Sequence, residues 1–220
     1  MSADSGASTA AVLAAVEAEE GRLSPKKRAV LEAALLCFAE QGYAASSTRE
    51  IARRAGVAEA TIFRHFASKP DLLLRLLRPL AHRMILPAID DSKDLIIAAS
   101  DDIEELVRRM MTLRLGFADQ HAPIVRILLQ ELPVNPAVQQ LVQEGLATTL
   151  TALADRVIAR EVAAGRIRPI PTHRLLRLLA SAMIGYWVTR SMIAPGDWDD
   201  AAEIDAMATI FAQGLRPSSV

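Results

Sequence analysis

Residues 47–69 constrain this chain more than any other segment, because they predict two short helices joined by a tight turn. Apolar residues recur at the spacing of one buried helical face, at Ile51 and Ala55 in the first helix and at Ile62 and Phe66 in the second. The second helix keeps small and hydrogen-bonding side chains on its outer face, which fits the major groove of duplex DNA. The pattern therefore predicts a helix-turn-helix that reads DNA.

Basic residues are concentrated around the same segment. The net charge at pH 7 is −1, yet residues 22–83 carry twelve Lys or Arg against five Asp or Glu, and residues 1–21 carry four acids and no base. A local basic excess suits phosphate binding, since each neutralised phosphate releases condensed counterions. Basic stretches are also common as plain solvated surface, but coincidence with the helical pair favours the DNA interpretation.

Composition favours an all-helical protein that resides in a reducing compartment. Apolar residues make up 51% and aromatic residues 4% of the 220 residues, as in Leu- and Ala-rich helical chains. The one cysteine, Cys37, excludes an internal disulfide, and we interpret it as a small buried apolar residue. We expect a cytoplasmic protein without a membrane span, because charges interrupt every apolar run and the start lacks a basic signal region.

Nothing in the sequence predicts catalysis. An enzyme would need a nucleophile with a base, a metal cluster or a nucleotide-binding loop. The histidines are scattered, and neither an HExxH pattern nor a phosphate-binding loop occurs. We expect no catalytic residue, no cofactor and no metal site.

The chain divides into three predicted parts. Residues 1–23 predict a flexible extension that either folds transiently or packs on the body. Residues 24–69 form the helix-turn-helix domain, whose first helix begins at Ser24 as N-cap with Pro25 at its first position. The remaining 70–220 predict a larger helical domain.

The pattern of the larger domain predicts a series of amphipathic helices separated by Pro, Gly and Asp. We expect helices over about 71–86, from 103 onward, over 123–131, 135–165 and 172–193, and from Asp199 onward. Residues 172–193 are apolar nearly all round and predict the most buried helix. The last two helices carry more apolar surface than one protomer can cover, which predicts a homodimer.

Thr48 to Lys69 follow the pattern T-x-x-I-A-x-x-A-G-V-x-x-x-T-x-F-x-H-F-x-S-K. With its flanks, Lys26 to Leu74, this stretch resembles the DNA-binding domain of the tetracycline-repressor (TetR) family. The resemblance covers about a third of the chain. It implies an all-helical homodimeric regulator, usually a repressor, with a three-helix DNA-binding domain and a C-terminal domain that binds a small molecule.

The resemblance and the helix pattern together give a set of DNA-contacting residues. They are Ser47, Thr48, Arg49, Ala58, Glu59, Ala60, Thr61, Phe63, Arg64, His65 and Lys69. Three of them depart from the family pattern, since Ala58 stands where serine is common, Ala60 where glycine is frequent and Phe63 where a tyrosine usually contacts phosphate. Loss of that tyrosine hydroxyl removes one hydrogen bond, worth roughly 0.5–1.5 kcal/mol.

Two of these residues have more than one interpretation. Arg49 either grips guanine O6 and N7 or serves as a phosphate clamp or solvated charge. Glu59 either accepts from a cytosine amine or pairs within the protein, with Arg64 or with the edge formed by Arg53 and Arg54. Thr48 is expected to cap the second helix through its hydroxyl.

The C-terminal domain predicts an adaptable apolar pocket with polar anchors, although each residue also fits plain core packing. Its predicted lining is Met110, Arg114, Phe117, His121, Leu128, Met183, Tyr186 and Trp187. The predicted function is a repressor released from a palindromic double-stranded DNA operator by a small apolar or amphipathic effector. The alternative is a DNA-binding regulator without such an effector, controlled by a protein partner.

Overall fold

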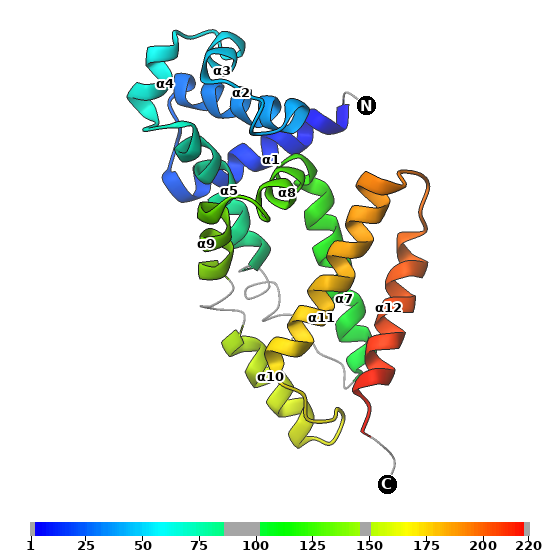
Figure 1. Cartoon of the computed structure of the whole chain (residues 1–220). Helices are drawn as coiled ribbons and strands as arrows, with labels where there is room; N and C mark the ends of the chain where they lie inside the picture. Colours follow the sequence, from blue (N-terminus) through cyan, green and yellow to red (C-terminus); the bar gives the residue numbers. More distant parts are fainter. Residues whose placement is uncertain (1–2, 86–101, 146–150, 218–220) are drawn as a thin grey trace. The chain divides into compact units, whose positions relative to one another are not determined.

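The computed structural model describes residues 3–85, 102–145 and 151–217, and every regular element among them is a helix (Figure 1). The predicted all-α class is confirmed. The chain separates into two compact units, one built from Met1–Arg83 with Asp119–Gly145 and the other from Met84–Ala118 with Leu146–Val220.

The helices of the first unit precede and follow an excursion of the chain into the second. The first unit contains α1 (Ala3–Glu20), α2 (Pro25–Gln41), α3 (Thr48–Arg54), α4 (Glu59–His65), most of α5 (Lys69–Ile85), α8 (Ala122–Glu131) and α9 (Pro136–Gly145). The second unit contains most of α7 (Ile103–Gln120), α10 (Thr151–Ala163), α11 (Thr172–Val188), the π-helical turn η2 (Thr189–Ile193) and α12 (Asp200–Leu215).

The start and end of α2 follow the sequence signals. The Ser24 hydroxyl accepts from the backbone N–H of Lys27 at 3.3 Å, and Pro25 occupies the first helical position. At the other end Gly42 has a φ of +82°, which glycine adopts without the steric cost of a side chain, and its N–H donates to the carbonyl of Phe38 at 3.0 Å. Cys37 is buried in this helix as predicted, and burial raises the pKa of its thiol.

Of the two possibilities for residues 1–23, transient folding or packing on the body, the structure shows the second, with Ala3–Glu20 as helix α1. Helix α1 lies against α2 and α8 (Figure 1). Leu13 and Val16 are at most 1% exposed, and the Ser8 hydroxyl donates to the carbonyl oxygen of Gln120 at 2.6 Å. The weak apolar stripe seen in the sequence is sufficient because alanines let the helices approach closely, so burial is achieved with few large side chains.

Helices α2, α3 and α4 form the predicted three-helix arrangement. The turn between α3 and α4 requires Gly56, whose φ is +66°, and the N–H of Val57 donates back to the carbonyl of Ala52 at 3.0 Å. Ile51 and Ile62 are fully buried at the centre. The buried stripes expected from the sequence therefore hold α3 and α4 together and fix which faces remain outside.

In the second unit α7, α11 and α12 lie side by side, and α11 and α12 run in opposite directions (Figure 1). Arg108 of α7 pairs with Asp205 of α12 at 2.6 Å, and Thr209 of α12 donates to Glu104 at 2.9 Å. Asp199 caps α12 by accepting from the N–H of Ala202 at 3.1 Å. These contacts join two helices that are about a hundred residues apart in sequence.

One expectation about the later helices is wrong for the single chain, and another lies partly outside the described residues. Helix α11 is not the most buried helix, since Leu178 and Ile184 are 44% and 45% exposed. The long helix expected over 135–165 is described as α9 and α10, with residues 146–150 outside the described part. A helix that is apolar on all sides is predicted to be buried, but Leu178 and Ile184 are left exposed by the part of the chain that the structure describes.

Candidate nucleic-acid interface

The start of α3 differs from the expected one by a residue. Ser47, not Thr48, is the N-cap, and its hydroxyl accepts from the N–H of Glu50 at 3.1 Å. Thr48 is therefore the first helical residue, and its hydroxyl donates to Oε1 of Glu59 at 2.5 Å. The expected pairing of Glu59 with Arg64, Arg53 or Arg54 is not the contact that forms. Sequence reasoning missed this bond because it joins residues eleven apart across the turn.

Helix α4 presents the predicted outer face. Its N-cap position is taken by Ala58, which supplies no side-chain hydrogen bond. Glu59, Ala60, Phe63 and Arg64 are exposed, with the Phe63 ring 50% exposed. An exposed carboxylate, methyl group, aromatic ring and guanidinium therefore occupy consecutive turns of one short helix.

The remaining predicted contact residues of this region lie deeper. Thr61 and His65 of α4 are half-buried, and the His65 ring meets Phe66 edge-on with 6.4 Å between ring centroids. On α3, Arg49 is exposed and Thr48 is half-buried. Except for Lys69, the predicted set thus lies on α3 and α4 or at their N-cap positions, with some side chains exposed and others half-buried.

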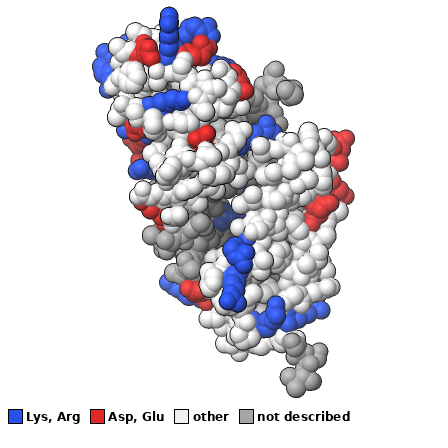
Figure 2. All heavy atoms as spheres, viewed as in Figure 1, with Lys and Arg blue, Asp and Glu red and all other residues white. Residues whose placement is uncertain are grey.

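Not every cation of the basic region is available. Arg53 pairs with Glu50 at 2.6 Å and Arg54 with Glu40 at 2.5 Å, and these arginines hold the pKa values of both carboxyl groups below their usual range. Figure 2 shows acidic side chains among the basic ones at the end of the first unit that carries α3 and α4. Within the described residues, Arg49 on α3 takes part in no ion pair, so it can meet a phosphate or base without first losing a partner.

Lys69 at the start of α5 is folded back onto the protein. Its ammonium lies 4.3 Å from the ring centroid of Tyr43 and 3.4 Å from the carbonyl oxygen of Ala44. Burial lowers the pKa of Lys69 and raises the pKa of Tyr43, while the Glu131 carboxylate of α8 favours the charged lysine. Tyr43 was missed as part of this site, since no local pattern pairs residues so far apart along the chain.

The predicted effector-binding residues are divided between the two units. His121 and Leu128 are buried in the first unit. In the second, Tyr186 and Trp187 are buried, and the Tyr186 hydroxyl donates to the carboxylate of Asp200 while its ring meets Trp198 edge-on at 5.7 Å. The other four residues of the second unit are half-buried, namely Met110, Arg114, Phe117 and Met183.

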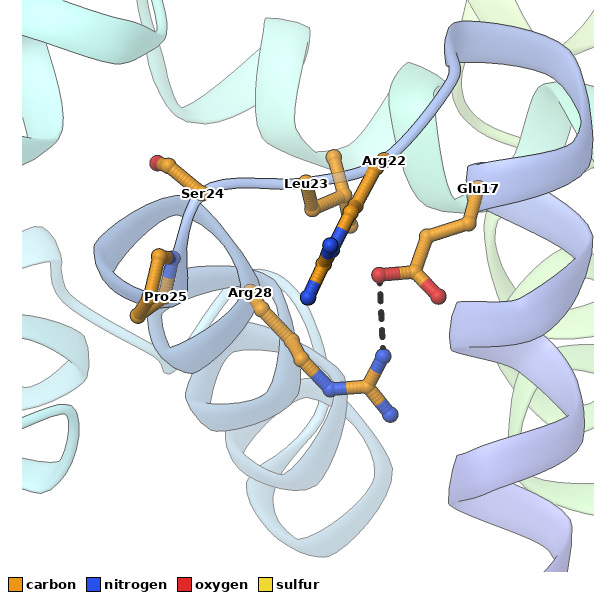
Figure 3. A pocket seen from close by; sticks show the side chains of 6 residues that line it. All are labelled: Glu17, Arg22, Leu23, Ser24, Pro25 and Arg28. Carbon is orange, nitrogen blue, oxygen red and sulfur yellow. Dashed lines mark ion pairs between the residues drawn. The ribbon is translucent and has the colours of Figure 1, made fainter.

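An open hollow lies elsewhere, beside the start of α2 (Figure 3). It is lined by Glu17, Arg22, Leu23, Ser24, Pro25 and Arg28. The guanidinium of Arg28 pairs with Glu17 at 3.0 Å across it. The hollow is lined by groups that already hold α1 to α2, so we assign no ligand to it.

Other classes of site find no support in the part of the chain that the structure covers. Across residues 3–85, 102–145 and 151–217, no group of three or more His, Cys, Asp or Glu side chains is arranged to hold a metal ion. No helix among the described residues is long and apolar enough to cross a membrane.

In this small three-helix domain a glycine turn joins α3 to α4, and α4 is the exposed helix. This arrangement defines a helix-turn-helix DNA-binding protein. Residues 30–76 match the family described as bacterial regulatory proteins, tetR family. The DNA-binding domain of this chain therefore belongs to the TetR family of transcriptional regulators. The resemblance seen in the sequence is confirmed, and with it the expectation of a regulator in place of an enzyme.

Similar proteins extend the likeness beyond the matched domain. The chain is 26% identical over 192 residues to the fatty acid metabolism regulator protein of Bacillus subtilis, covering 87% of this chain and 96% of that protein. It is 29% identical over 163 residues to the transcriptional regulator RutR of Escherichia coli, covering 72% and 73%. The crystal structure of FadR from Bacillus subtilis in complex with stearoyl-CoA has the same fold, with a TM-score of 0.66 at 20% identity over 86% of this chain and 98% of that one.

Proposed function

We propose that this protein is a homodimeric repressor that binds a palindromic operator through α3 and α4 and leaves it when a long-chain acyl-CoA binds. The observation that carries the DNA part is the exposed face of Arg49, Glu59, Phe63 and Arg64 on a matched TetR DNA-binding domain. The predicted contact set from Ser47 to Lys69 is our proposal for the DNA interface. Phosphates would be met by the cations and by recessed Thr61 and His65, and bases by the outer residues of α4.

The dimer is part of the proposal because one helix-turn-helix reads only a half-site. Two recognition helices must reach successive major grooves about 34–36 Å apart. Apolar side chains left exposed on α11 and α12, namely Leu178, Ile184 and Ile210, support an interface through these helices.

An acyl-CoA effector is suggested by two similar proteins. One is named for fatty acid metabolism and is aligned over most of both chains, and the other is the FadR structure that contains stearoyl-CoA. An amphipathic ligand of this kind needs apolar lining with a cation for its phosphates. In the second unit the half-buried Met110, Phe117 and Met183 are our candidates for the apolar lining, and Arg114 is our candidate for the cation. By linkage, release requires the ligand to bind the DNA-free conformation more tightly than the DNA-bound one.

The test begins with selection of bound sequences from random duplex DNA by the purified full chain. We expect a palindrome, and affinity for it that falls steeply with salt because phosphate contacts release counterions. Stearoyl-CoA is then titrated into the complex, with stearate and coenzyme A alone as controls. Release by stearoyl-CoA only is the expected result. Enrichment of a palindrome without release by any of the three would leave the DNA part standing and favour control by a protein partner.

A further inference from the structure

The first turns of α3 and α4 are tied together by one side-chain bond. The Thr48 hydroxyl donates to Oε1 of Glu59 at 2.5 Å. Thr48 is half-buried and Glu59 is exposed on the outer face of α4. The carboxylate is therefore held at one oxygen while its other oxygen, Oε2, remains available.

Thr48 is not needed to cap the helix that it begins. Ser47 already caps α3, so the Thr48 hydroxyl is not required there. The nearby arginines are committed to other acids, Arg53 to Glu50 and Arg54 to Glu40. Among the described residues Glu59 has no cation as partner, and the side chain that holds its carboxylate is the uncharged Thr48 hydroxyl.

A carboxylate at this position discriminates strongly between hydrogen-bond donors and acceptors on the DNA. It only accepts hydrogen bonds, so it is repelled by phosphates and by the exposed acceptors of guanine and thymine. Adenine offers an amine next to its own acceptor N7, whereas cytosine offers its N4 amine with no acceptor on its own major-groove edge. Cytosine is thus the base edge that matches an anchored Glu59.

We propose that Glu59 is a specificity-determining residue that accepts from a cytosine amine, and that Thr48 is a positioning residue that holds its carboxylate. This inference rests on the proposed DNA-binding function and names what that interface reads. A fixed carboxylate loses less side-chain freedom on binding than a mobile one, so the bond from Thr48 sharpens the choice of base.

The experiment is selection from random duplex DNA with the full chain and matched variants. We expect the wild type to enrich cytosine at one symmetric position of each half-site. Glu59→Gln should replace that cytosine by adenine, because an amide pairs with N6 and N7 of adenine, and leave other positions unchanged. Glu32→Gln removes the same charge from the exposed side of α2 and should leave the selected sequence unaltered.

Thr48→Val tests the positioning role. Discrimination at the cytosine position should fall about two- to tenfold, as expected for the loss of one hydrogen bond, with the rest of the selected sequence intact. Thr48→Ser keeps the hydroxyl and should restore the wild-type preference. A purely structural role of Thr48 would instead lower the melting temperature and affinity for all sequences equally.

Each contrary outcome has a separate meaning. If Glu59→Gln selects the same palindrome as the wild type, or binds every sequence more tightly, Glu59 does not read a base and the inference is overturned while the proposed function stands. Unchanged discrimination with Thr48→Val refutes the positioning role. If the wild type enriches no sequence, the proposed DNA-binding function itself fails.

Discussion

Phe63 is the residue at which the interface departs most from its family. The ring is 50% exposed on α4 and lacks the hydroxyl with which a tyrosine would contact phosphate. We expect Phe63→Tyr to tighten operator binding about two- to tenfold, which corresponds to one added hydrogen bond. Fluorescence anisotropy with the selected operator measures it.

The control for this change is Phe63→Leu, which alters the ring without adding a hydroxyl. Binding by this variant should be equal to or weaker than wild type. Equal affinities of Phe63→Tyr and wild type would mean that no phosphate lies within reach of position 63.

Glu161 gives the second unit a dependence on pH. Its side chain is 6% exposed and accepts from Arg166 at 2.6 Å and Arg160 at 3.0 Å, and Arg166 above all holds the pKa of the carboxyl below its usual value of 4.5. Because the pKa is lowered in the folded protein, the stabilisation is complete above about pH 4.5 and is lost as the pH falls through the folded value. Acid should therefore weaken this unit.

The corresponding variant is Glu161→Gln, with Asp155→Asn on the exposed side of the same helix as control. We expect Glu161→Gln to cost about 1–3 kcal/mol in the free energy of unfolding at pH 7, and the cost to shrink toward pH 3. Urea unfolding at several pH values measures the difference. A cost that stays constant with pH would contradict the linkage to this carboxyl.

Prediction of single residues from the sequence succeeded where the local backbone determines the role of a position. It failed where the contact of a side chain depends on residues far away in the sequence. Ser24 and Gly42 follow from capping and from positive φ. Thr48 and Ser47 are adjacent hydroxyls, either of which could cap α3, and only the turn of the chain decides between them. The contact of Glu59 with Thr48 depends on how α4 packs against α3, and that of Lys69 with Tyr43 on how α5 lies beside the segment after α2, which no local pattern contains.

At the scale of elements, α1 is the helix that the sequence left most open, because residues 1–23 were expected either to fold transiently or to pack on the body. Its apolar face is short and rich in alanine, so periodicity alone gave a weak signal. We expect Leu13→Ala to destabilise the first unit by about 2–5 kcal/mol, because Leu13 is 1% exposed and the space it leaves is enclosed. Chemical denaturation followed by circular dichroism measures the loss.

Ala14→Ser, at an exposed position of the same helix, is the matched control and should change the free energy of unfolding by well under 1 kcal/mol. A small effect of Leu13→Ala would mean that α1 unfolds separately from α2 and α8. Melting of the wild type in two steps would point the same way.

At the scale of the whole molecule, the apolar residues left outside α11 and α12 are the main unexplained surface. Composition correctly indicated an excess of apolar surface in these helices but not which face remains open, since that depends on how α7 and α12 pack on one another. We expect Ile184→Glu together with Ile210→Glu to give a monomer in sedimentation velocity and to weaken operator binding at least a hundredfold, because two half-sites are no longer linked.

Val134→Glu places the same charge at a residue that is 73% exposed in the first unit, and it should remain dimeric. A dimer that survives both changes in α11 and α12 would place the interface on another surface.

Glu20 at the end of α1 meets Lys27 of α2 at 2.5 Å and Arg75 of α5 at 3.1 Å. One carboxylate thus bridges the first helix of the DNA-binding domain and the helix that leaves it. Any rotation of α5 against α2 must either carry α1 along or exchange these contacts for water. The amino-terminal helix is consequently a suitable place to observe a rotation of α5 against α2. Because Cys37 is buried, a cysteine introduced at exposed Ala18 can carry a single fluorescent dye for this purpose.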